Sequence, residues 1–151
     1  LHSYDEALVL LGELEKAVGD QPPSRQKDLY RSIYLRMGDV WWERPQRSLE
    51  RAQAFYARAI AADPSSAEAH YRMGQVYLEG SPINAIKEFV EARKADPNYA
   101  PAYRNLGYLY KDLGKCANAI ESLQEYLKRA PRAADRAEVT DEVERLRGDC
   151  R

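Results

Sequence analysis

Hydrophobic residues between positions 98 and 131 recur every three or four residues in two runs, which Gly114 separates. This spacing places the apolar side chains of each run on one face of a helix. Pro131 ends the second run, because proline cannot continue a helix. The apolar faces contain Tyr103, Leu106, Gly107 and Tyr110 in the first run and Ala119, Leu123 and Tyr126 in the second. The segment therefore predicts a helical hairpin, and so short a hairpin needs neighbours to bury its apolar faces.

The same order of small, aromatic and proline residues occurs twice more upstream of this hairpin. Gly107 follows Gly74 by 33 residues, and Gly74 follows Gly38 by 36 residues. The longer interval indicates extra residues in the turn at 43–48, because the helix after that turn keeps a 33-residue spacing from its counterpart in the next unit. The sequence thus predicts three successive hairpins, over residues 24–64, 65–97 and 98–131.

This pattern of Gly-x-x-Tyr/Trp, then Ala-x-x-x-Phe/Tyr/Leu, then Pro, with a period near 34 residues, resembles the tetratricopeptide repeat. The resemblance covers residues 24–131 as three units. It implies an all-α fold, a right-handed superhelix (α-solenoid) of antiparallel helix pairs. It also implies that the first helix of each unit lines a concave groove, where relatives bind extended peptides or a helix of a partner.

Further helices are predicted at both ends of the chain. Residues 1–23 contain a helix to about Val18 and a linker, and this helix is either the trailing half of a degenerate repeat or an independent cap. Residues 132–151 contain a capping helix at 133–147, which Gly148 ends. This helix has one apolar face and one charged face, which suits the end of a solenoid, where a helix packs against a neighbour on one side only. The residues expected to face water are Asp135, Arg136, Glu138, Asp141, Glu142, Glu144, Arg145 and Arg147.

The charge balance argues against several kinds of partner. With 23 basic and 24 acidic residues, the net charge is −1, so no basic excess exists to hold a phosphate backbone and no nucleic-acid partner is expected. No run of 18 apolar residues occurs, so direct membrane insertion is not expected. Because the chain begins with Leu1 and not with Met, we expect it to be a segment of a longer protein.

No motif in the sequence predicts catalysis. The chain has two histidines, and neither has a metal-ligand spacing with Cys116 or Cys150. Phosphate loops, nucleophile elbows and dinucleotide fingerprints do not occur. His70 takes the place that Tyr34 and Tyr103 take in the sister units, which predicts a packing role. We therefore expect no enzyme, no catalytic residue, no metal site and no cofactor.

The groove is the predicted binding site. We expect exposed aromatic and apolar side chains there to act as anchors, since such residues dominate protein interfaces. Arg104 and Lys111 are expected to orient an acidic or polar group of the ligand. The alternative is that Trp42 and Tyr108 only cover a neighbouring helix or a terminal segment. The predicted groove residues are Leu35, Asp39 and Trp42 in the first unit, Tyr71, Gln75 and Leu78 in the second, and Arg104, Tyr108 and Lys111 in the third.

One subtype of ligand is not expected. Co-chaperone relatives bind the C-terminal carboxylate of a chaperone tail with two lysines, two asparagines and an arginine. The matching positions here hold Leu35, Asp39, Arg72, Pro101 and Asn105. Since Asp39 would repel a carboxylate, a chaperone C-terminal tail is not the expected partner.

Cys116 and Cys150 are 34 residues apart, so if the last helix stacks as a half unit, they lie in turns of adjacent layers. They form either a disulfide, if the tail after Gly148 bends inward, or two free thiols. A disulfide would favour the bacterial periplasm or cell envelope over the cytoplasm. The sequence leaves the compartment open.

The sequence favours a non-enzymatic scaffold that binds a peptide or a partner helix in its concave groove, within a larger protein or complex. Another hypothesis is a structural docking module, in which the convex face or the N-terminal end makes the contacts and the groove is unused. A third is a regulatory domain attached to an enzyme.

Overall fold

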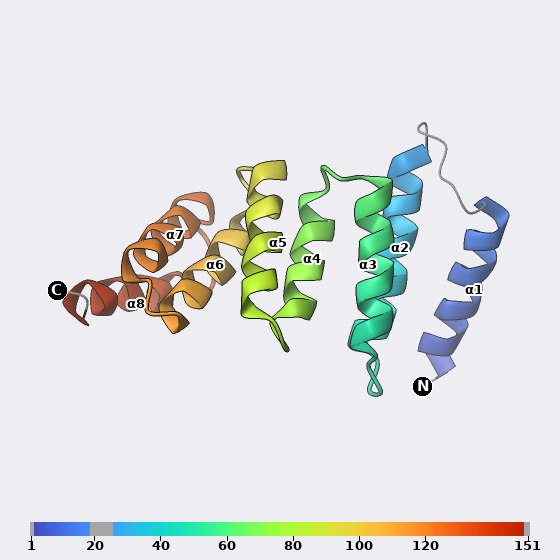
Figure 1. Cartoon of the computed structure of the whole chain (residues 1–151), viewed down its shortest axis with the longest axis horizontal. Helices are drawn as coiled ribbons and strands as arrows, with labels where there is room; N and C mark the ends of the chain where they lie inside the picture. Colours follow the sequence, from blue (N-terminus) through green and yellow to red (C-terminus); the bar gives the residue numbers. More distant parts are fainter. Residues whose placement is uncertain (1, 19–25, 150–151) are drawn as a thin grey trace.

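The computed structural model describes residues 2–18 and 26–149, and within these ranges the chain is helical without strands. Its helices are α1 (His2–Val18), α2 (Lys27–Glu43), α3 (Leu49–Ala62), α4 (Ala67–Tyr77), α5 (Pro82–Ala95), α6 (Ala100–Asp112), α7 (Cys116–Arg129) and α8 (Arg136–Asp149). They follow one another along the molecule from α1 at one end to α8 at the other (Figure 1). The predicted all-α solenoid is confirmed.

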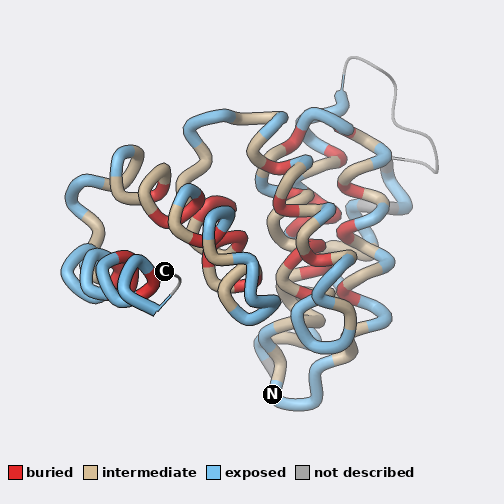
Figure 2. Tube along the Cα trace, turned by 60° about the vertical axis from the view of Figure 1, so that its left-hand side comes forward, coloured by how far each residue is buried: buried red, intermediate tan, exposed pale blue. Residues whose placement is uncertain are grey.

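The helices pack as antiparallel pairs that stack in chain order. Helix α2 packs on α3, α4 on α5 and α6 on α7, while α3 on α4 and α5 on α6 join successive pairs. At the ends, α1 packs on α2 and α8 packs on α7. Each helix thus contacts mainly its neighbours in sequence, which is the arrangement of a repeat solenoid. Buried positions run through the interior of the stack (Figure 2).

Glycine allows the two helices of each pair to approach closely. A Cβ atom added at Gly38 would lie 2.4 Å from the ring of Tyr56, and one added at Gly74 would lie 2.5 Å from the ring of Phe89. Gly107 has the same relation to Leu123, at 2.5 Å. The repeated glycine of the sequence is therefore required by contact between helices and not by backbone conformation.

The turn between the first and second pairs is fixed by two buried polar residues, Asp63 and Ser66. Asp63 is 4% exposed, accepts hydrogen bonds from the backbone N–H and the hydroxyl of Ser65, and pairs with Arg31 at 2.6 Å. The Ser66 hydroxyl then caps α4 by accepting the N–H of Ala69. The hydrogen bond from Ser65 lowers the pKa of Asp63, with burial opposing and Arg31 assisting.

His70 has the packing role that its place in the repeat predicts. Its Nε2 lies 3.1 Å from the carbonyl oxygen of Pro64, and the hydroxyl of Tyr103 contacts the carbonyl of Pro97 at the same distance in the next unit. Its Nδ1 lies 2.8 Å from Glu88 of the partner helix. His70 thus links the turn before its helix to the second helix of the same pair.

The last helix differs from its prediction in two respects. Helix α8 begins at Arg136 and continues through Gly148, because residues 130–136 form hydrogen-bonded turns and Asp135 accepts the first helical N–H, from Val139. Glu142, expected to face water, is 6% exposed. It is buried because Lys111 and Arg145 pair with its two carboxylate oxygens.

Candidate partner-binding groove

Side chains connect the first helix of each pair to the first helix of the next pair. These helices are α2, α4 and α6, and α8 follows them. Asp39 of α2 lies 3.5 Å from Arg72 of α4, and Tyr71 of α4 packs against Tyr99 at the start of α6. Arg104 of α6 in turn meets Asp135, just before α8, at 2.5 Å. The predicted groove residues therefore lie along a continuous row of helices, although not all of them face its open surface.

Leu35 is a correction to the predicted groove. Its exposed fraction is 6%, and it belongs to the core cluster that α2, α3 and α4 share. Its neighbour Tyr34 is also buried, since α2 packs against other helices on two sides. The helical period predicted one packed face of α2 and did not reveal the packing of the other side.

Asp39 is held in place by two partners. It accepts a hydrogen bond of 2.8 Å from the hydroxyl of Tyr56 and pairs with Arg72. Burial raises the pKa of Tyr56, and the charge of Asp39 adds to this effect. Burial acts to lower the pKa of Arg72, but Asp39 together with smaller contributions from Tyr56, Glu68 and Tyr99 leaves that pKa above its ordinary value. The acidic residue that was predicted to face a ligand is thus already neutralised by Arg72.

Trp42, the third predicted residue of α2, is half-buried. Its ring packs against the first core cluster, and the guanidinium of Arg47 lies 5.3 Å from the ring centroid. A cation over an indole ring is attracted by its negative face. Trp42 therefore covers neighbouring side chains in part, as the alternative interpretation supposed, and keeps part of its surface open.

Leu78, the residue after the end of α4, is the most exposed of the predicted groove residues, at 42%. The Oε1 atom of Gln75 is buried without a hydrogen-bond partner among the described residues, a rare state for a buried acceptor. Tyr71 packs between Phe89 and Tyr99, with ring centroids 5.6 and 5.4 Å away. This part combines an exposed apolar side chain with an unsatisfied polar one.

Tyr99 packs against the predicted groove residue Tyr71, and the sequence reasoning did not include it. It precedes the first turn of α6, outside the helical stripe from which the groove was predicted. Burial raises its pKa to about 12, so it keeps its proton at neutral pH. The repeated Asp-Pro turn before α6 could have indicated that the residue after it folds back toward α4.

The two cations of α6 are paired within the molecule. Lys111 lies 3.3 Å from Glu142, and both Lys111 and Arg104 lie 5.2 Å from the ring centroid of Tyr108. A hollow of about 400 Å³ separates this part of α6 from α8. Its lining comprises Tyr108, Lys111, Glu138, Asp141, Glu142 and Arg145. A ligand carboxylate at this place would have to compete with carboxylates of the chain.

Asp135 connects the groove to the core of the last layer. It accepts hydrogen bonds of 2.5 Å from the hydroxyl of Tyr126 and from Nε of Arg104. The hydrogen bond from Tyr126 lowers the pKa of Asp135, burial opposes it, and Arg104 adds to the lowering. Burial, together with Asp135, raises the pKa of Tyr126 to about 12. Asp135 is therefore a carboxylate at neutral pH.

Cys116 is disulfide-bonded in the structure. Cys150, its predicted partner, lies outside the described residues, so the pairing stays a prediction. In the described part of the chain, no group of His, Cys, Asp and Glu residues is arranged to hold a metal ion. None of the described helices has the length and apolar character that crossing a bilayer requires.

Comparison with known proteins shows what the chain is similar to. Residues 100–132 match the family model described as tetratricopeptide repeat. Superkiller protein 3 of Schizosaccharomyces pombe is 39% identical over 62 residues, which are 38% of this chain and only 4% of that protein. The structure of MamA matches with a TM-score of 0.76 at 20% identity, covering 96% of this chain and 79% of that one. The complex of the TPR2B domain of yeast Sti1 with pHsp70 matches with a TM-score of 0.70 at 17% identity, covering 82% and 99%. The structural matches show the fold.

Proposed function

Because the chain belongs to the tetratricopeptide repeat family, whose fold is that of a protein–protein interaction module, we propose that it binds a peptide or a partner helix along α2, α4 and α6. No catalytic or cofactor chemistry enters this proposal. The structural neighbour from yeast Sti1 is a complex with pHsp70 on the same fold, which supports a peptide ligand.

The observation that carries the proposal is the open part of α4. Leu78 exposes 42% of its surface beside Gln75, whose buried Oε1 has no hydrogen-bond partner in the part of the chain that the structure describes. In the preceding unit the corresponding acid, Asp39, is satisfied by the hydroxyl of Tyr56. The next unit has Phe89 in place of that tyrosine, and phenylalanine has no hydroxyl to donate. A backbone N–H of a bound peptide would satisfy the Gln75 amide after its rotation toward the groove.

The charges favour a ligand without a free carboxylate anchor. Arg72, Arg104 and Lys111 all pair with carboxylates of the chain. Of the positions that hold a chaperone tail in co-chaperone relatives, Leu35 is buried and Asp39 is acidic. We therefore propose an internal peptide segment with an apolar residue for Leu78, and not a C-terminal tail.

The proposal is tested with a displayed library of internal peptides. Selected peptides are titrated against the intact chain and against Leu78→Glu, with Leu113→Glu as the control. Leu113 is 45% exposed, close to the 42% of Leu78, and lies at the end of α6 outside the predicted groove. A charge at an anchor position should weaken binding by at least ~10-fold, and the control should leave it unchanged. Equal affinity of both variants would show that the groove is not the binding site.

A further inference from the structure

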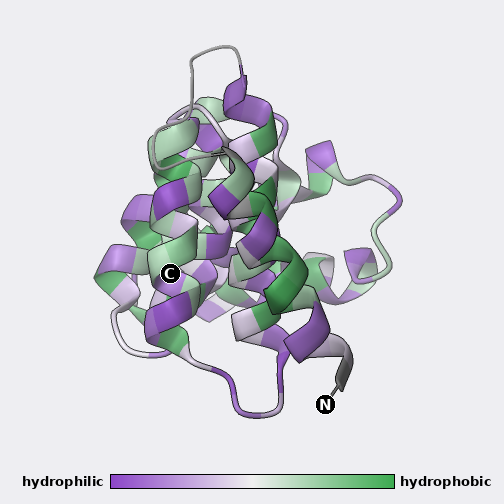
Figure 3. Ribbon diagram, turned by 90° about the vertical axis from the view of Figure 1, so that its right-hand side faces the viewer, coloured by the Kyte–Doolittle hydropathy of each residue, from purple (hydrophilic) through white to green (hydrophobic). Residues whose placement is uncertain are grey.

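Three side chains of different chemistry lie on one face of helix α4. Arg72, Gln75 and Leu78 follow one another at intervals of three residues, and residues at this interval are neighbours on a helix surface. Hydrophobic and hydrophilic positions lie side by side on the helices of the solenoid (Figure 3). On α4 this arrangement places a cation, an amide and an apolar side chain in one row, so that one ligand can contact all three.

Arg72 is a cation whose N–H groups are not fully used. Its Nε lies 3.5 Å from Oδ1 of Asp39, and its Nη2 lies 3.8 Å from Oε1 of Glu68. Both distances exceed the ~2.7–3.2 Å of an ordinary N–H···O hydrogen bond. Arg104, in contrast, donates to Asp135 at 2.5 Å. Because a guanidinium has several N–H groups and the Arg72 side chain is 30% exposed, Arg72 keeps donors that a ligand can reach.

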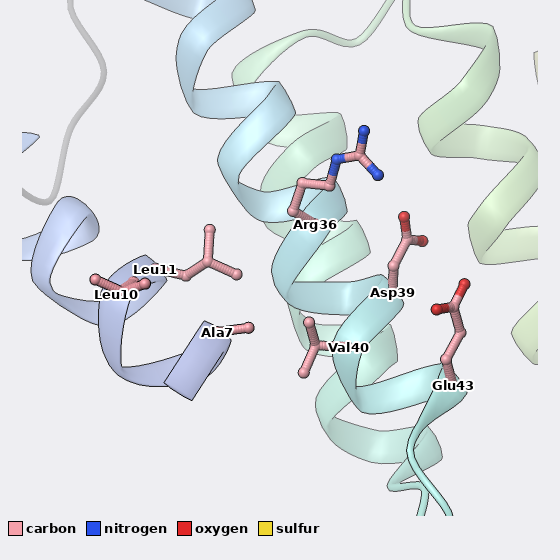
Figure 4. Close-up of a pocket in the computed structure, with 7 residues that line it drawn as sticks. All are labelled: Ala7, Leu10, Leu11, Arg36, Asp39, Val40 and Glu43. Atoms are coloured by element: carbon pink, nitrogen blue, oxygen red, sulfur yellow. The ribbon is translucent and has the colours of Figure 1, made fainter. Parts of the chain in front are cut away.

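The acids near Arg72 decide which kind of acceptor it can bind. Asp39 projects from α2 on the side away from α1 (Figure 4), and it is one of the residues that line a hollow of about 390 Å³ along α2. Together with Glu68 it places two carboxylates beside the guanidinium of Arg72. These carboxylates would repel a carboxylate of a ligand, whereas a neutral carbonyl oxygen needs only an N–H donor. Arg72 is therefore suited to a carbonyl oxygen.

Gln75 supplies an acceptor beside these donors. Its Oε1 is buried and has no hydrogen-bond partner in the helices that the structure describes. A buried acceptor without a partner costs free energy, which the N–H of a ligand would recover. Since residues three apart on a helix have Cβ atoms ~5–6 Å apart, the acceptor of Gln75 and the donors of Arg72 can contact the same residue of a ligand.

A donor and an acceptor at this spacing fit the main chain of an extended peptide. In an extended chain the N–H and the C=O of one residue point to the same side, as in the hydrogen-bonded pairs of an antiparallel sheet. In a helix these groups are bonded within the helix itself. We infer that Arg72 and Gln75 bind the main chain of one ligand residue: Arg72 donates to its carbonyl oxygen, and Gln75 accepts its N–H.

This inference rests on the proposed function and specifies the ligand as an extended peptide rather than a partner helix. Main-chain hydrogen bonds do not depend on the side chain of the bound residue, so peptides of many sequences should bind. Two restrictions apply to them. The bound residue is not proline, which has no N–H. A neighbouring residue presents an apolar side chain to Leu78, which is 42% exposed.

The probe is a library peptide whose binding Leu78→Glu weakens, acetylated and amidated at its ends so that it carries no terminal charge. Each of its N–H groups in turn is replaced by N–CH₃, and affinities are measured by isothermal titration calorimetry. One N-methyl group should weaken binding to the intact chain at least ~5-fold, since it removes a hydrogen bond. Against Gln75→Leu the same methylated peptide should bind within ~2-fold of its unmethylated form, because the acceptor is gone.

Further variants test the role of Arg72 and the integrity of the fold. Arg72→Gln should weaken binding at least ~5-fold, because it removes the donor of a hydrogen bond. Arg36→Gln, at the corresponding position 36 residues earlier, should leave binding unchanged. Gln75→Leu removes an unsatisfied acceptor and should not lower the free energy of unfolding measured in urea.

The outcomes separate this inference from the proposed function. If every N-methyl group costs the same in the intact chain and in Gln75→Leu, or if Arg72→Gln binds as tightly as the intact chain, while Leu78→Glu still weakens binding, this inference is wrong and the groove remains the binding site. Tighter binding of a stapled, helical form of the peptide would also overturn it, in favour of a partner helix. If no library peptide responds to Leu78→Glu, the proposed function and this inference both fail.

Discussion

The contact between Gly74 and Phe89 predicts that Gly74→Ala destabilises the intact chain but stabilises a variant in which Phe89 is replaced by alanine. A Cβ atom at position 74 would lie 2.5 Å from Cε1 and 2.7 Å from Cδ1 of Phe89. Phe89 is 0% exposed, so its ring has no free space into which to move. Gly74→Ala should therefore force the helices α4 and α5 apart, although alanine is the better helix former.

The magnitude follows from these opposing terms. Overpacking of a core costs ~1–3 kcal/mol, and replacing helical glycine by alanine gains ~1 kcal/mol. Gly74→Ala should then destabilise the intact chain by up to ~2 kcal/mol. Phe89→Ala alone should cost ~3–5 kcal/mol through the cavity that it leaves. In that background the added methyl group enters the cavity, and Gly74→Ala should stabilise the protein by ~1–2 kcal/mol. The coupling free energy of the two substitutions is therefore ~1–4 kcal/mol.

The assay is urea unfolding followed by helical circular dichroism, for the four members of the double-mutant cycle. Trimethylamine N-oxide, at the same concentration in all samples, keeps the less stable variants folded. Gly12→Ala is the matched control, because nothing lies within 4 Å of a Cβ atom at this position of α1. The control should gain up to ~1 kcal/mol. If Gly74→Ala is as harmless as Gly12→Ala, or the coupling is below ~0.5 kcal/mol, contact between helices is not the reason for the repeated glycine.

Two further predictions concern pH. The hydrogen bond with Glu88 raises the pKa of His70 against the opposing effect of burial. Its contribution to stability is therefore complete below the unfolded pKa near 6.5 and is lost as the pH rises through the folded value. His70→Gln should remove this pH dependence at a cost below ~1 kcal/mol, measured by urea unfolding between pH 5.5 and 8.5. Asp135 has a lowered pKa, mainly through Tyr126 and with Arg104 adding, so its contribution is present above about pH 4 and is lost on acidification. Asp135→Asn should destabilise the chain by ~1–3 kcal/mol at pH 7 and less at pH 3; an equal loss at both pH values would contradict the role of the charge.

Much of the fold was predictable because each unit repeats the same steric requirement, a glycine opposite a large side chain, at positions that can be recognised in the sequence. A small residue, an aromatic or leucine residue and a closing proline recur at fixed intervals, and the structure brings Gly38 to Tyr56 and Gly74 to Phe89. Three such contacts in register leave little freedom for the stack of helices. The bounds of α8 were less predictable, because they depend on Asp135, whose carboxylate is drawn to Arg104 and Tyr126.

The groove was less predictable than the fold. Helical periodicity gives the direction in which a side chain points, but it does not show which residues of other helices cover that side chain or pair with it. Leu35 was placed in the groove by its angle on α2, yet the adjacent helices bury it. Arg104 and Lys111 were predicted as groove residues together with Tyr108, and both lie 5.2 Å from its ring centroid. Their pairing with Asp135 and Glu142 depends on how α8 folds back. No signal within a single unit reports such a contact between layers.

The differences between corresponding positions of the three units give the proposed groove a direction. In the first unit Asp39 accepts the hydroxyl of Tyr56 and is satisfied. In the second, Phe89 offers no hydroxyl, and the buried Oε1 of Gln75 has no partner within residues 2–18 and 26–149. In the third, Tyr108 occupies the same position between two cations. The fold requires only that the side chains opposite the glycines are large and apolar, so these polar differences are free to serve recognition. An extended ligand would meet a satisfied acid, an open amide and a cation-flanked ring in that order, and we therefore expect it to bind in one orientation only.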